Sequence, residues 1–337
     1  MPASSRGQHI AVLGAGSWGT ALAIHLARAE LSVCLWGNDP AHIERLHQQR
    51  SNQQFLPGVE FPASLCVEAR LDVVLASAAW VLLAIPSHAF RPFLHANAQL
   101  FNAEVPVAWA SKGLEQGTAK LLHEVVSEEI PQCQHLAVIS GPTFAKEVAA
   151  NLPTAITVAS NSTEFASVLT EALHSGRFRV YVTDDITGVE LGGAVKNVLA
   201  IAAGAADGLG FGANARTALI TRGLAEMMRL GEAMGGRRET FMGLAGMGDL
   251  VLTCTDDQSR NRRMGLLLAQ GKSEADIRQL IGQEIEGVKT AQEVMRLAEK
   301  YHIDMPITRQ VYRVLYQGVS PQNAVRELLN RDSTNEF

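Results

Sequence analysis

The sequence predicts an α/β protein in which an N-terminal, doubly wound and mostly parallel sheet is followed by a C-terminal all-α domain. Three observations support this prediction. Residues 9–37 contain a strand, a glycine turn, a helix and a second strand, β-rich runs then alternate with helical patterns up to residue 182, and only helical periodicity follows residue 185. We therefore expect domains over residues 8–187 and 188–330, with disordered tails at 1–7 and 331–337.

Length and composition narrow the classes of function. A chain of 337 residues suits two domains, and its net charge of −5 argues against a nucleic-acid or membrane-surface partner. The uncharged stretch 73–90 contains polar residues that fit a helix end and a buried strand rather than an integral membrane segment, and no basic-then-apolar leader opens the chain. The four cysteines form no CxxC pair and the ten histidines form no HExxH motif. We therefore expect no disulfide framework, no metal and a reducing, cytoplasmic location.

The glycine turn Gly14-Ala15-Gly16-Ser17-Trp18-Gly19 is the strongest local motif. Gly14 allows a tight turn, Gly16 lets the backbone approach a pyrophosphate, and Gly19 lets the following helix lie against the preceding strand. N–H groups at the start of that helix then face the anion. The motif predicts a Rossmann-type dinucleotide site, because its surroundings are a strand, a helix and a second strand at 10–13, 20–29 and 31–36.

The end of the second strand is where NAD and NADP are often distinguished. Many NAD-binding folds place an acidic residue there to hold the ribose 2′-hydroxyl. Here Asn38 could accept either cofactor, and Asp39 is as well explained as the cap of a polar helix over 41–50. The residues alone leave the choice between NAD and NADP open.

Five further β-rich runs complete a sheet of about eight strands, with the later strands at its edge. They are 80–85, 105–110, 135–140, 154–159 and 178–182, with a helix expected at 163–174.

Polar residues follow several of these runs at the edge where open α/β sheets bind ligands. Lys112 either lines the ligand site or is a solvated loop lysine. Ser87 either caps the next helix or lines the cofactor site. Thr143 is expected to begin a helix whose N–H groups face the same region.

The second half is a series of helical patterns at 186–206, 213–235, 259–269, 274–281, 287–301 and 306–316. In the first of them, Gly192 and Gly193 precede Lys196 on one helical face. Glycine in a helix interior costs about 1 kcal/mol relative to alanine, so some gain must offset it. Either a ligand is pressed against this face and meets Lys196, or the glycines allow a tight helix crossing while Lys196 extends outward.

Two more clusters lie in this half. The segment 242–250 contains several glycines, but no strand precedes it, so we expect a turn that presents Asp249 between two helices rather than a second nucleotide loop. The second cluster is Thr253 followed within ten residues by Ser259, Arg260 and Asn261. The last three, at a helix start, suit a phosphate, and Arg262 and Arg263 either extend that charge or are solvated. The alternative is a capped, charged surface helix.

The motifs GAGSWG, SKGLE, GPTFAKE, GGAVKN, GFGANARTALITRGLAEM, GLAGMGDLVLTCT, SRNRR, EGV and MPI occur in that order. Together they resemble bacterial NAD(P)-dependent glycerol-3-phosphate dehydrogenases from about Ile10 to Leu329. The resemblance implies reversible hydride transfer between NAD(P)H and dihydroxyacetone phosphate, giving sn-glycerol 3-phosphate for glycerophospholipid synthesis. It also implies a cytoplasmic homodimer, and it slightly favours NADP.

The resemblance makes Lys196 the proton-transferring residue. Two positions depart from the usual pattern: Asn38 replaces a basic or imidazole side chain, and Glu284 replaces an apolar one. The implied substrate residues are Lys112, Gly141, Thr143, Lys196, Asp249, Ser259, Arg260 and Asn261. The implied cofactor residues are Gly14, Gly16, Ser17, Trp18, Gly19, Asn38, Lys112, Ala145, Arg260 and Glu286.

The chemistry of the residues agrees with this activity. Hydride transfer to a ketone leaves negative charge on oxygen, which a positioned ammonium stabilises and then protonates, and Asp249 is expected to orient Lys196. A β-hydroxyacid dehydrogenase is a rival enzyme class, separated by assaying 3-hydroxy acids. A nucleotide sensor without catalysis is the rival of another class, and it predicts cofactor binding without turnover.

Overall fold

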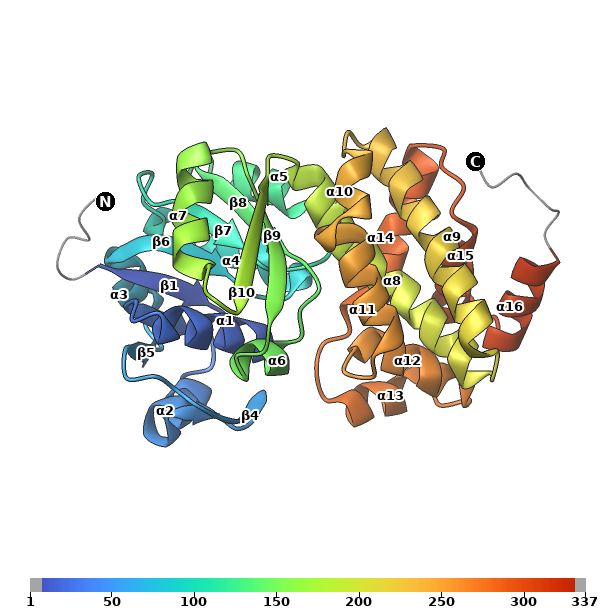
Figure 1. Ribbon diagram of the computed structural model, residues 1–337, viewed down its shortest axis with the longest axis horizontal. Helices are drawn as coiled ribbons and strands as arrows, with labels where there is room; N and C mark the ends of the chain where they lie inside the picture. The colour runs from blue at the N-terminus through green and yellow to red at the C-terminus, as the bar shows by residue number, and fades with distance from the viewer. Residues whose placement is uncertain (1–7, 331–337) are drawn as a thin grey trace. The chain divides into compact units, whose positions relative to one another are not determined.

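The computed structural model describes residues 8–330, so the two tails expected to be disordered lie outside the described residues. The described chain forms two compact units (Figure 1). Unit 1 contains residues 8–112 and 121–190, and unit 2 contains 113–120 and 191–330. The division falls after Glu190, a few residues beyond the expected boundary, and the assignment of 113–120 to unit 2 is a feature that sequence periodicity does not reveal.

The core of unit 1 is an eight-stranded sheet of order β10-β9-β8-β7-β6-β1-β2-β5. Every neighbouring pair is parallel except β8 and β9, so the doubly wound, mostly parallel sheet is confirmed, with β10 at one edge. Its strands are β1 (His9–Leu13), β2 (Val33–Trp36), β5 (Leu65–Glu68), β6 (Ala78–Leu83), β7 (Val107–Trp109), β8 (Leu136–Ser140), β9 (Thr154–Ser160) and β10 (Phe178–Thr183).

Helices cover both faces of this sheet because its strands are apolar on both sides. Val12, Leu35 and Leu82 lie in register on three neighbouring strands and share one buried core with α1, α6 and α7. On the other face, Trp109 packs against Phe90 of α4 with ring centroids 6.5 Å apart. These helices are α1 (Ser17–Arg28), α3 (Leu71–Ala76), α4 (Ser87–Asn97), α5 (Leu122–Glu129), α6 (Ala145–Ala149) and α7 (Thr163–Leu173).

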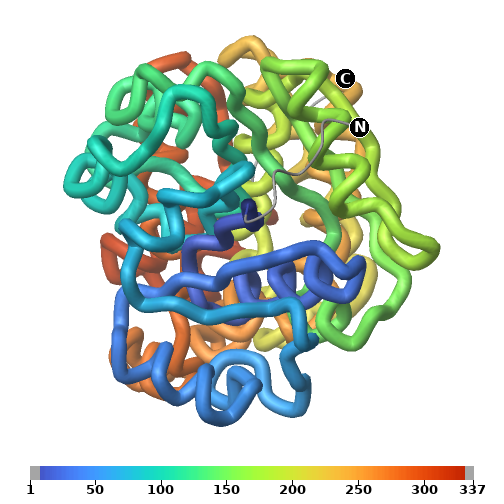
Figure 2. The backbone as a smooth tube through the Cα atoms, turned by 90° about the vertical axis from the view of Figure 1, so that its left-hand side faces the viewer, coloured from blue at the N-terminus to red at the C-terminus, as the bar shows by residue number. Residues whose placement is uncertain are grey.

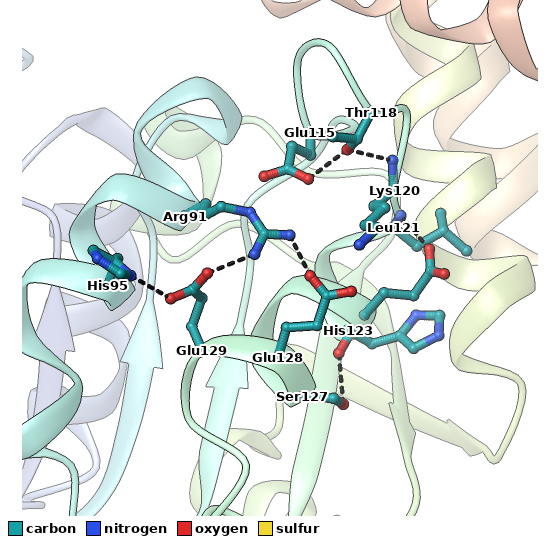
Figure 3. A network of polar contacts seen from close by, with 11 residues as sticks. Arg91, His95, Glu115, Thr118, Lys120, Leu121, His123, Ser127, Glu128 and Glu129 are labelled. Atoms are coloured by element: carbon teal, nitrogen blue, oxygen red, sulfur yellow. Dashed lines mark hydrogen bonds and ion pairs between the residues drawn. The ribbon is translucent and has the colours of Figure 1, made fainter.

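Ion pairs join α4 to α5 on that second face (Figure 3). Arg91 contacts Glu128 at 2.6 Å and Glu129 at 2.5 Å, and His95 Nδ1 lies 2.9 Å from the Glu129 carboxylate. Glu129 has a lowered pKa because the side chains of His95 and Arg91 hydrogen-bond to its carboxylate. Exposed pairs of this kind contribute little stability, but they fix the relative position of the two helices.

Unit 1 differs from the prediction in several places. Ser87 is the first residue of α4 and Pro86 occupies the cap position, so the capping interpretation of Ser87 is wrong. Strand β5 and a small hairpin were not predicted, because each is short and lies among turn-forming residues. That hairpin, β3 (Ser51–Asn52) and β4 (Leu56–Glu60), follows α2 (Pro40–Gln49), and both are drawn in lighter blue at the bottom of Figure 2.

Unit 2 is helical, as predicted. Its central helices cross with almost no side chain between them: a Cβ on Gly204 of α8 would lie 2.0 Å from the Arg262 carbonyl, and one on Gly265 of α12 would lie 2.0 Å from the Ile201 carbonyl. The long helices are α8 (Ile186–Gly208), which begins in unit 1, α9 (Gly212–Ala233), α12 (Arg260–Ala269), α13 (Glu274–Ile281), α14 (Glu286–Lys300), α15 (Pro306–Tyr316) and α16 (Pro321–Leu329).

Helix α8 is also, within residues 8–330, the single helix with the length and apolar character to cross a bilayer. Its most apolar window has a hydropathy of 1.3 and is 83% buried inside the protein. A mostly buried core helix meets the same criterion of length and apolar composition, and α8 is mostly buried.

Two short segments complete unit 2. For residues 242–250 we predict a turn that presents Asp249 between two helices. The structure has a π-helical turn (Leu244–Gly248) between α10 (Arg238–Met242) and α11 (Asp249–Thr255), and Asp249 is the first residue of α11. Residues 113–120 attach to α14, because Gly117 donates its N–H to Glu293 and accepts a hydrogen bond from Arg296. Figure 3 shows Thr118 of this segment bonded to Glu115.

Candidate active site

The glycine turn of unit 1 has the backbone that a dinucleotide site needs. Gly14 has φ of +126°, and a Cβ there would lie 2.5 Å from the Ala84 carbonyl. A Cβ on Gly19 would lie 2.0 Å from the Gly14 carbonyl. At Gly16, by contrast, a Cβ would meet nothing within 4 Å. Gly14 and Gly19 are thus required by the fold, whereas the absence of a side chain at Gly16 leaves room for a ligand.

The first residues of α1 fit the same site. Gly16 is the N-cap and has no side-chain capping bond, so the first N–H groups of the helix remain directed out of its N-terminal end. Ser17 Oγ donates to the Phe55 carbonyl at 2.7 Å, which ties the turn to the β3–β4 hairpin. Trp18 Nε1 is buried and has no partner among the described residues. The open space at Gly16, the N-terminus of α1 and the unpartnered Trp18 N–H are features that suit a bound pyrophosphate and its sugars.

The end of β2 gives a partial answer to the NAD or NADP question. Asp39 accepts from the Ala41 N–H at 3.0 Å, so it is the cap of α2, which was one of its two interpretations. Asn38 is exposed and directly follows Gly37 at the end of β2. Because a neutral amide neither repels a phosphate nor replaces an acidic partner of a 2′-hydroxyl, this loop stays compatible with both cofactors.

Lys112 and Thr143 meet at one carbonyl group. Both Lys112 Nζ and Thr143 Oγ1 donate to the Gly141 carbonyl oxygen at 3.2 Å. Lys112 follows β7 and Gly141 follows β8, so they lie at the carboxyl ends of neighbouring parallel strands. Lys112 is thus hydrogen-bonded at the carboxyl ends of these strands and is not merely a solvated loop lysine. Thr143 does not begin a helix: α6 begins at Ala145, another predicted site residue, with Phe144 at the N-cap.

In unit 2, Lys196 is held in a buried polar cluster. Its Nζ lies 2.5 Å from Asp249 Oδ1 and 2.9 Å from Thr253 Oγ1. Lys196 is 6% exposed and Asp249 is fully buried. The expectation that Asp249 orients this lysine is confirmed, and the alternative of an outward-extending side chain is wrong.

The backbone of α8 is closely packed at Gly192, one helical turn before the buried Lys196. A Cβ on Gly192 would lie 2.5 Å from the Ala245 carbonyl, so α8 runs directly against the π-helical turn. That turn leads into Asp249 at the start of α11. The tight-crossing interpretation of the glycine is therefore correct, and the crossing brings Asp249 to Lys196.

Thr253 completes the orientation of the amine. Its hydroxyl donates to the Asp249 backbone carbonyl at 2.6 Å, so its oxygen is left to accept from Lys196. Two acceptors therefore fix the direction of the Lys196 amine. A buried ion pair of this kind contributes little to net stability, but removing one member leaves a buried charge and costs about 3–5 kcal/mol.

Asn261 lies in a bridge between three helices. Asn261 Nδ2 donates to Asn197 Oδ1 at 2.8 Å, and Asn261 Oδ1 accepts from the Gly287 N–H at 2.9 Å. A Cβ on Gly287 would lie 2.6 Å from the Asn197 carbonyl, so α14 also approaches α8 closely here. The bridge places the start of α12 beside the helical turn that carries Lys196.

The start of α12 has the composition expected for a phosphate site. Ser259 is the N-cap and accepts from the Arg262 N–H at 3.2 Å. Arg260 is partly buried, and burial lowers its pKa while the carboxylates of Glu286 and Glu284 oppose that shift. Arg260 and Glu286, both expected at the cofactor, are therefore electrostatic neighbours. Glu284 is in turn paired with Lys289 at 3.1 Å.

Arg262 is not a solvated extension of this charge. It is buried, and its guanidinium contacts Asp207 at 2.5 Å and Asp257 at 2.9 Å. Burial lowers its pKa, but these two carboxylates raise it by more. Arg262 thus joins α12 to Asp207 of α8, so its guanidinium is engaged within the protein.

Sequence reasoning grouped Thr253 with the phosphate cluster at residues 259–261 and not with Lys196, and it gave Asn197 and Gly287 no role of their own. Their contacts join helices that are distant along the chain, so no local spacing signals them. Gly287 is the second residue of α14, where glycine is a poor helix former, and that is the one signal available. No group of three or more potential metal ligands occurs within residues 8–330.

Comparisons with known proteins agree with these features. The N-terminal model of NAD-dependent glycerol-3-phosphate dehydrogenase matches residues 9–166, and the C-terminal model of that family matches residues 185–326. A glycerol-3-phosphate dehydrogenase (NAD(P)+) of Shewanella frigidimarina is 54% identical over 328 residues, which cover 97% of each chain.

Solved structures show the same relationship. The crystal structure of glycerol-3-phosphate dehydrogenase from Coxiella burnetii has a TM-score of 0.93 and 51% identity, covering 96% of this chain and 99% of that one. The yeast enzyme from Saccharomyces cerevisiae is 26% identical with a TM-score of 0.82, covering 97% and 100% of the two chains. Because both halves match in order and the full-length bacterial relative is 54% identical, the chain belongs to the NAD(P)-dependent glycerol-3-phosphate dehydrogenase family.

Proposed function

We propose that this protein catalyses the reversible interconversion of dihydroxyacetone phosphate and sn-glycerol 3-phosphate with NAD(P)H. The observation that carries the proposal is the buried Lys196–Asp249–Thr253 cluster in a chain of this family. Bound NAD(P)H supplies the hydride. The product is the backbone of glycerophospholipids, and we propose that the enzyme supplies it for their synthesis in the cytoplasm as a homodimer.

Lys196 is assigned the proton transfer. The ammonium stabilises the negative charge that develops on the carbonyl oxygen during reduction and then donates a proton to that oxygen. In the oxidation direction the amine, once neutral, takes the proton of the alcohol. Asp249 and Thr253 hold Nζ in a single direction, so the group does not need to be ordered when substrate arrives.

The remaining polar residues are assigned to binding. Ser259, Arg260 and Asn261 would hold the substrate phosphate at the start of α12, with Lys112, Gly141 and Thr143 as further substrate contacts. On unit 1, the open position at Gly16 and the orphaned Trp18 donor support cofactor binding at the turn, with Gly14 and Gly19 shaping it. The other proposed cofactor residues are Ser17, Asn38, Lys112, Ala145, Arg260 and Glu286.

The experiment that tests the function is a steady-state assay of dihydroxyacetone phosphate reduction with NADH and NADPH in parallel, run on the wild type, Lys196→Ala and the exposed-lysine control Lys300→Ala. We expect Lys196→Ala to lower kcat by about 100- to 10,000-fold, since that is the range for loss of a positioned acid or base. Lys300→Ala should behave as the wild type. A kcat for Lys196→Ala within about tenfold of the wild type would remove the proton-transfer role.

A folding control is needed because Lys196→Ala leaves the Asp249 carboxylate buried without its cationic partner. The double variant Lys196→Met with Asp249→Asn removes both charges at similar volume. We expect it to remain folded by circular dichroism and to be inactive. If it were active, the cluster would be structural.

Arg260→Lys tests the phosphate assignment. Lysine keeps the charge but loses the two-pronged donor geometry, so we expect kcat/KM for dihydroxyacetone phosphate to fall about 10- to 100-fold. The much slower reaction with unphosphorylated dihydroxyacetone should be spared, and Arg263→Lys on the same helix should change neither. Equal losses on both substrates would contradict the phosphate role and indicate a cofactor role instead.

A further inference from the structure

Two cysteines that are far apart in the sequence are adjacent in unit 1. Cys34 on β2 and Cys66 on β5 are partners in the register of these parallel strands, and their sulfur atoms lie 2.7 Å apart. Partners on neighbouring strands direct their side chains to the same face of the sheet. Neighbouring strands lie about 4.8 Å apart, within the range of Cα separations that a disulfide spans. No backbone movement is therefore needed to join them.

The two thiols differ in accessibility. Cys66 is exposed on the edge strand β5, whereas Cys34 is buried at 4% exposure. An oxidant from solvent therefore reaches Cys66 first, and Cys34 is already in contact with the sulfur that would be oxidised.

The hydrogen bond between the two thiols favours Cys66 as the reactive thiolate. The hydrogen bond with Cys34 lowers the pKa of Cys66, burial and Glu68 oppose that shift, and Arg50 adds to it. The same bond and burial raise the pKa of Cys34. Arg50 is fixed beside β5, because its guanidinium donates to the Leu65 carbonyl at 2.8 Å and the Pro62 carbonyl at 2.6 Å.

We propose that Cys34 and Cys66 form a reversible disulfide when hydrogen peroxide, or another hydroperoxide, oxidises the folded protein. The Cys66 sulfur attacks a peroxide oxygen, the O–O bond breaks, and water leaves after protonation (an alcohol where the oxidant is an organic hydroperoxide), giving a sulfenic acid. The Cys34 sulfur then attacks the sulfenic sulfur, the S–S bond forms, the S–O bond breaks and water leaves. Two thiols lose two electrons in total and the peroxide gains them. An external dithiol reverses the reaction by exchange.

The other two cysteines provide internal controls. Cys133 and Cys254 are buried, and burial raises their thiol pKa values to about 11 and about 12. Such thiols are poor nucleophiles at neutral pH. Oxidation should therefore be confined to the Cys34–Cys66 pair.

The test is thiol counting by mass spectrometry on the full-length folded protein. Reduced protein is treated with a few equivalents of hydrogen peroxide, denatured with an alkylating reagent and digested. The variants are Cys34→Ser, Cys66→Ser and the matched control Cys133→Ser. Fully reduced wild type should be alkylated at all four cysteines, and oxidised wild type at two, with a peptide pair joined through Cys34 and Cys66.

Each variant has a distinct expected result. Cys133→Ser should still form the link, and a dithiol should restore its alkylation. Cys66→Ser should keep its three thiols, whereas Cys34→Ser should accumulate a sulfenic acid at Cys66 that a cyclic dione traps, because the resolving thiol is missing. The proposal is overturned if oxidised wild type keeps both thiols, if the link joins other cysteines or separate chains, or if Cys66→Ser is oxidised as fast as the wild type.

Discussion

Two segments of this protein contain three glycines within a few residues, and they use them in opposite ways. In residues 14–19 the glycines shape a turn and leave one position, Gly16, open to a ligand. In residues 242–248 the space beside the central glycine is occupied by the protein itself, because a Cβ on Gly246 would lie 2.1 Å from the Phe241 carbonyl oxygen. A glycine-rich stretch is thus a binding loop only where something other than the protein occupies the space.

The second segment nevertheless bears on the proposed proton transfer, because it positions Asp249 beside Lys196. The π-helical turn passes against Gly192 of α8 and ends at Asp249, which holds Lys196. Packing at the turn therefore decides where a buried carboxylate lies, whereas at residues 14–19 the backbone offers N–H groups directly to an anion. The comparison predicts that substitutions in the two segments damage different properties.

The largest effect is expected for Gly246→Ala. The added methyl group meets backbone atoms of Phe241 that cannot rotate away, so the turn must shift and move Asp249 relative to Lys196. We expect kcat to fall by at least about 100-fold and the free energy of unfolding to fall by roughly 2–3 kcal/mol, while the cofactor Kd stays unchanged.

Gly243→Ala is the matched control for that variant. A Cβ at this position in the same segment would lie 3.4 Å from the Thr240 carbonyl, an ordinary contact distance. Its activity and melting temperature should match those of the wild type. Equal behaviour of the two variants in kinetic and thermal assays would show that the segment tolerates shifts and does not position Asp249.

A smaller effect, of the opposite kind, is expected for Gly16→Ala. Nothing in the protein meets the new methyl group and φ is −78°, which alanine adopts without strain, so the melting temperature without cofactor should stay the same. The methyl group hinders the approach of a pyrophosphate, so the cofactor Kd measured by fluorescence titration should rise about 10- to 100-fold.

Gly14→Ala separates the two effects within the turn. Gly14 has a positive φ, and the methyl group of alanine would collide with the Ala84 carbonyl, so alanine is incompatible with the folded backbone. This variant should therefore lose stability as well as cofactor binding. If Gly16→Ala bound cofactor like the wild type, the turn would be an ordinary strand-to-helix connection.

These contrasts also show what the sequence could and could not predict. The strands of unit 1 are readable because buried parallel strands form continuous apolar runs, and the Gly192–Lys196 face stands out because glycine is costly inside a helix. The roles of Thr253 and Asn197 depend on contacts between helices more than fifty residues apart, such as the one from Lys196 to Thr253. The same holds for the π-helical turn, whose backbone is set by Phe241 and Gly192 and not by its own sequence pattern.

A more gradual effect, which develops with pH, concerns the helix that supports the second glycine segment. A Cβ on Gly231 of α9 would lie 2.0 Å from the Phe241 ring, so α9 packs directly on the residue that touches Gly246. The same helix carries Glu226, whose carboxyl accepts the N–H groups of Ile307 and Thr308 at the start of α15.

Burial raises the pKa of Glu226 from 4.5 to about 7, although these hydrogen bonds and Arg229 lower it in part. The folded state therefore binds a proton that the unfolded state releases between pH 4.5 and 7, and the stability that this group contributes falls as pH rises through that window. The loss is up to roughly 3 kcal/mol over the full window. Glu226→Gln has no proton to lose, so the difference between the urea midpoints of wild type and variant should change with pH between 5 and 7.5. A constant difference would show that Glu226 is ionised in the folded protein throughout, and that the packing beneath the second glycine segment does not depend on pH.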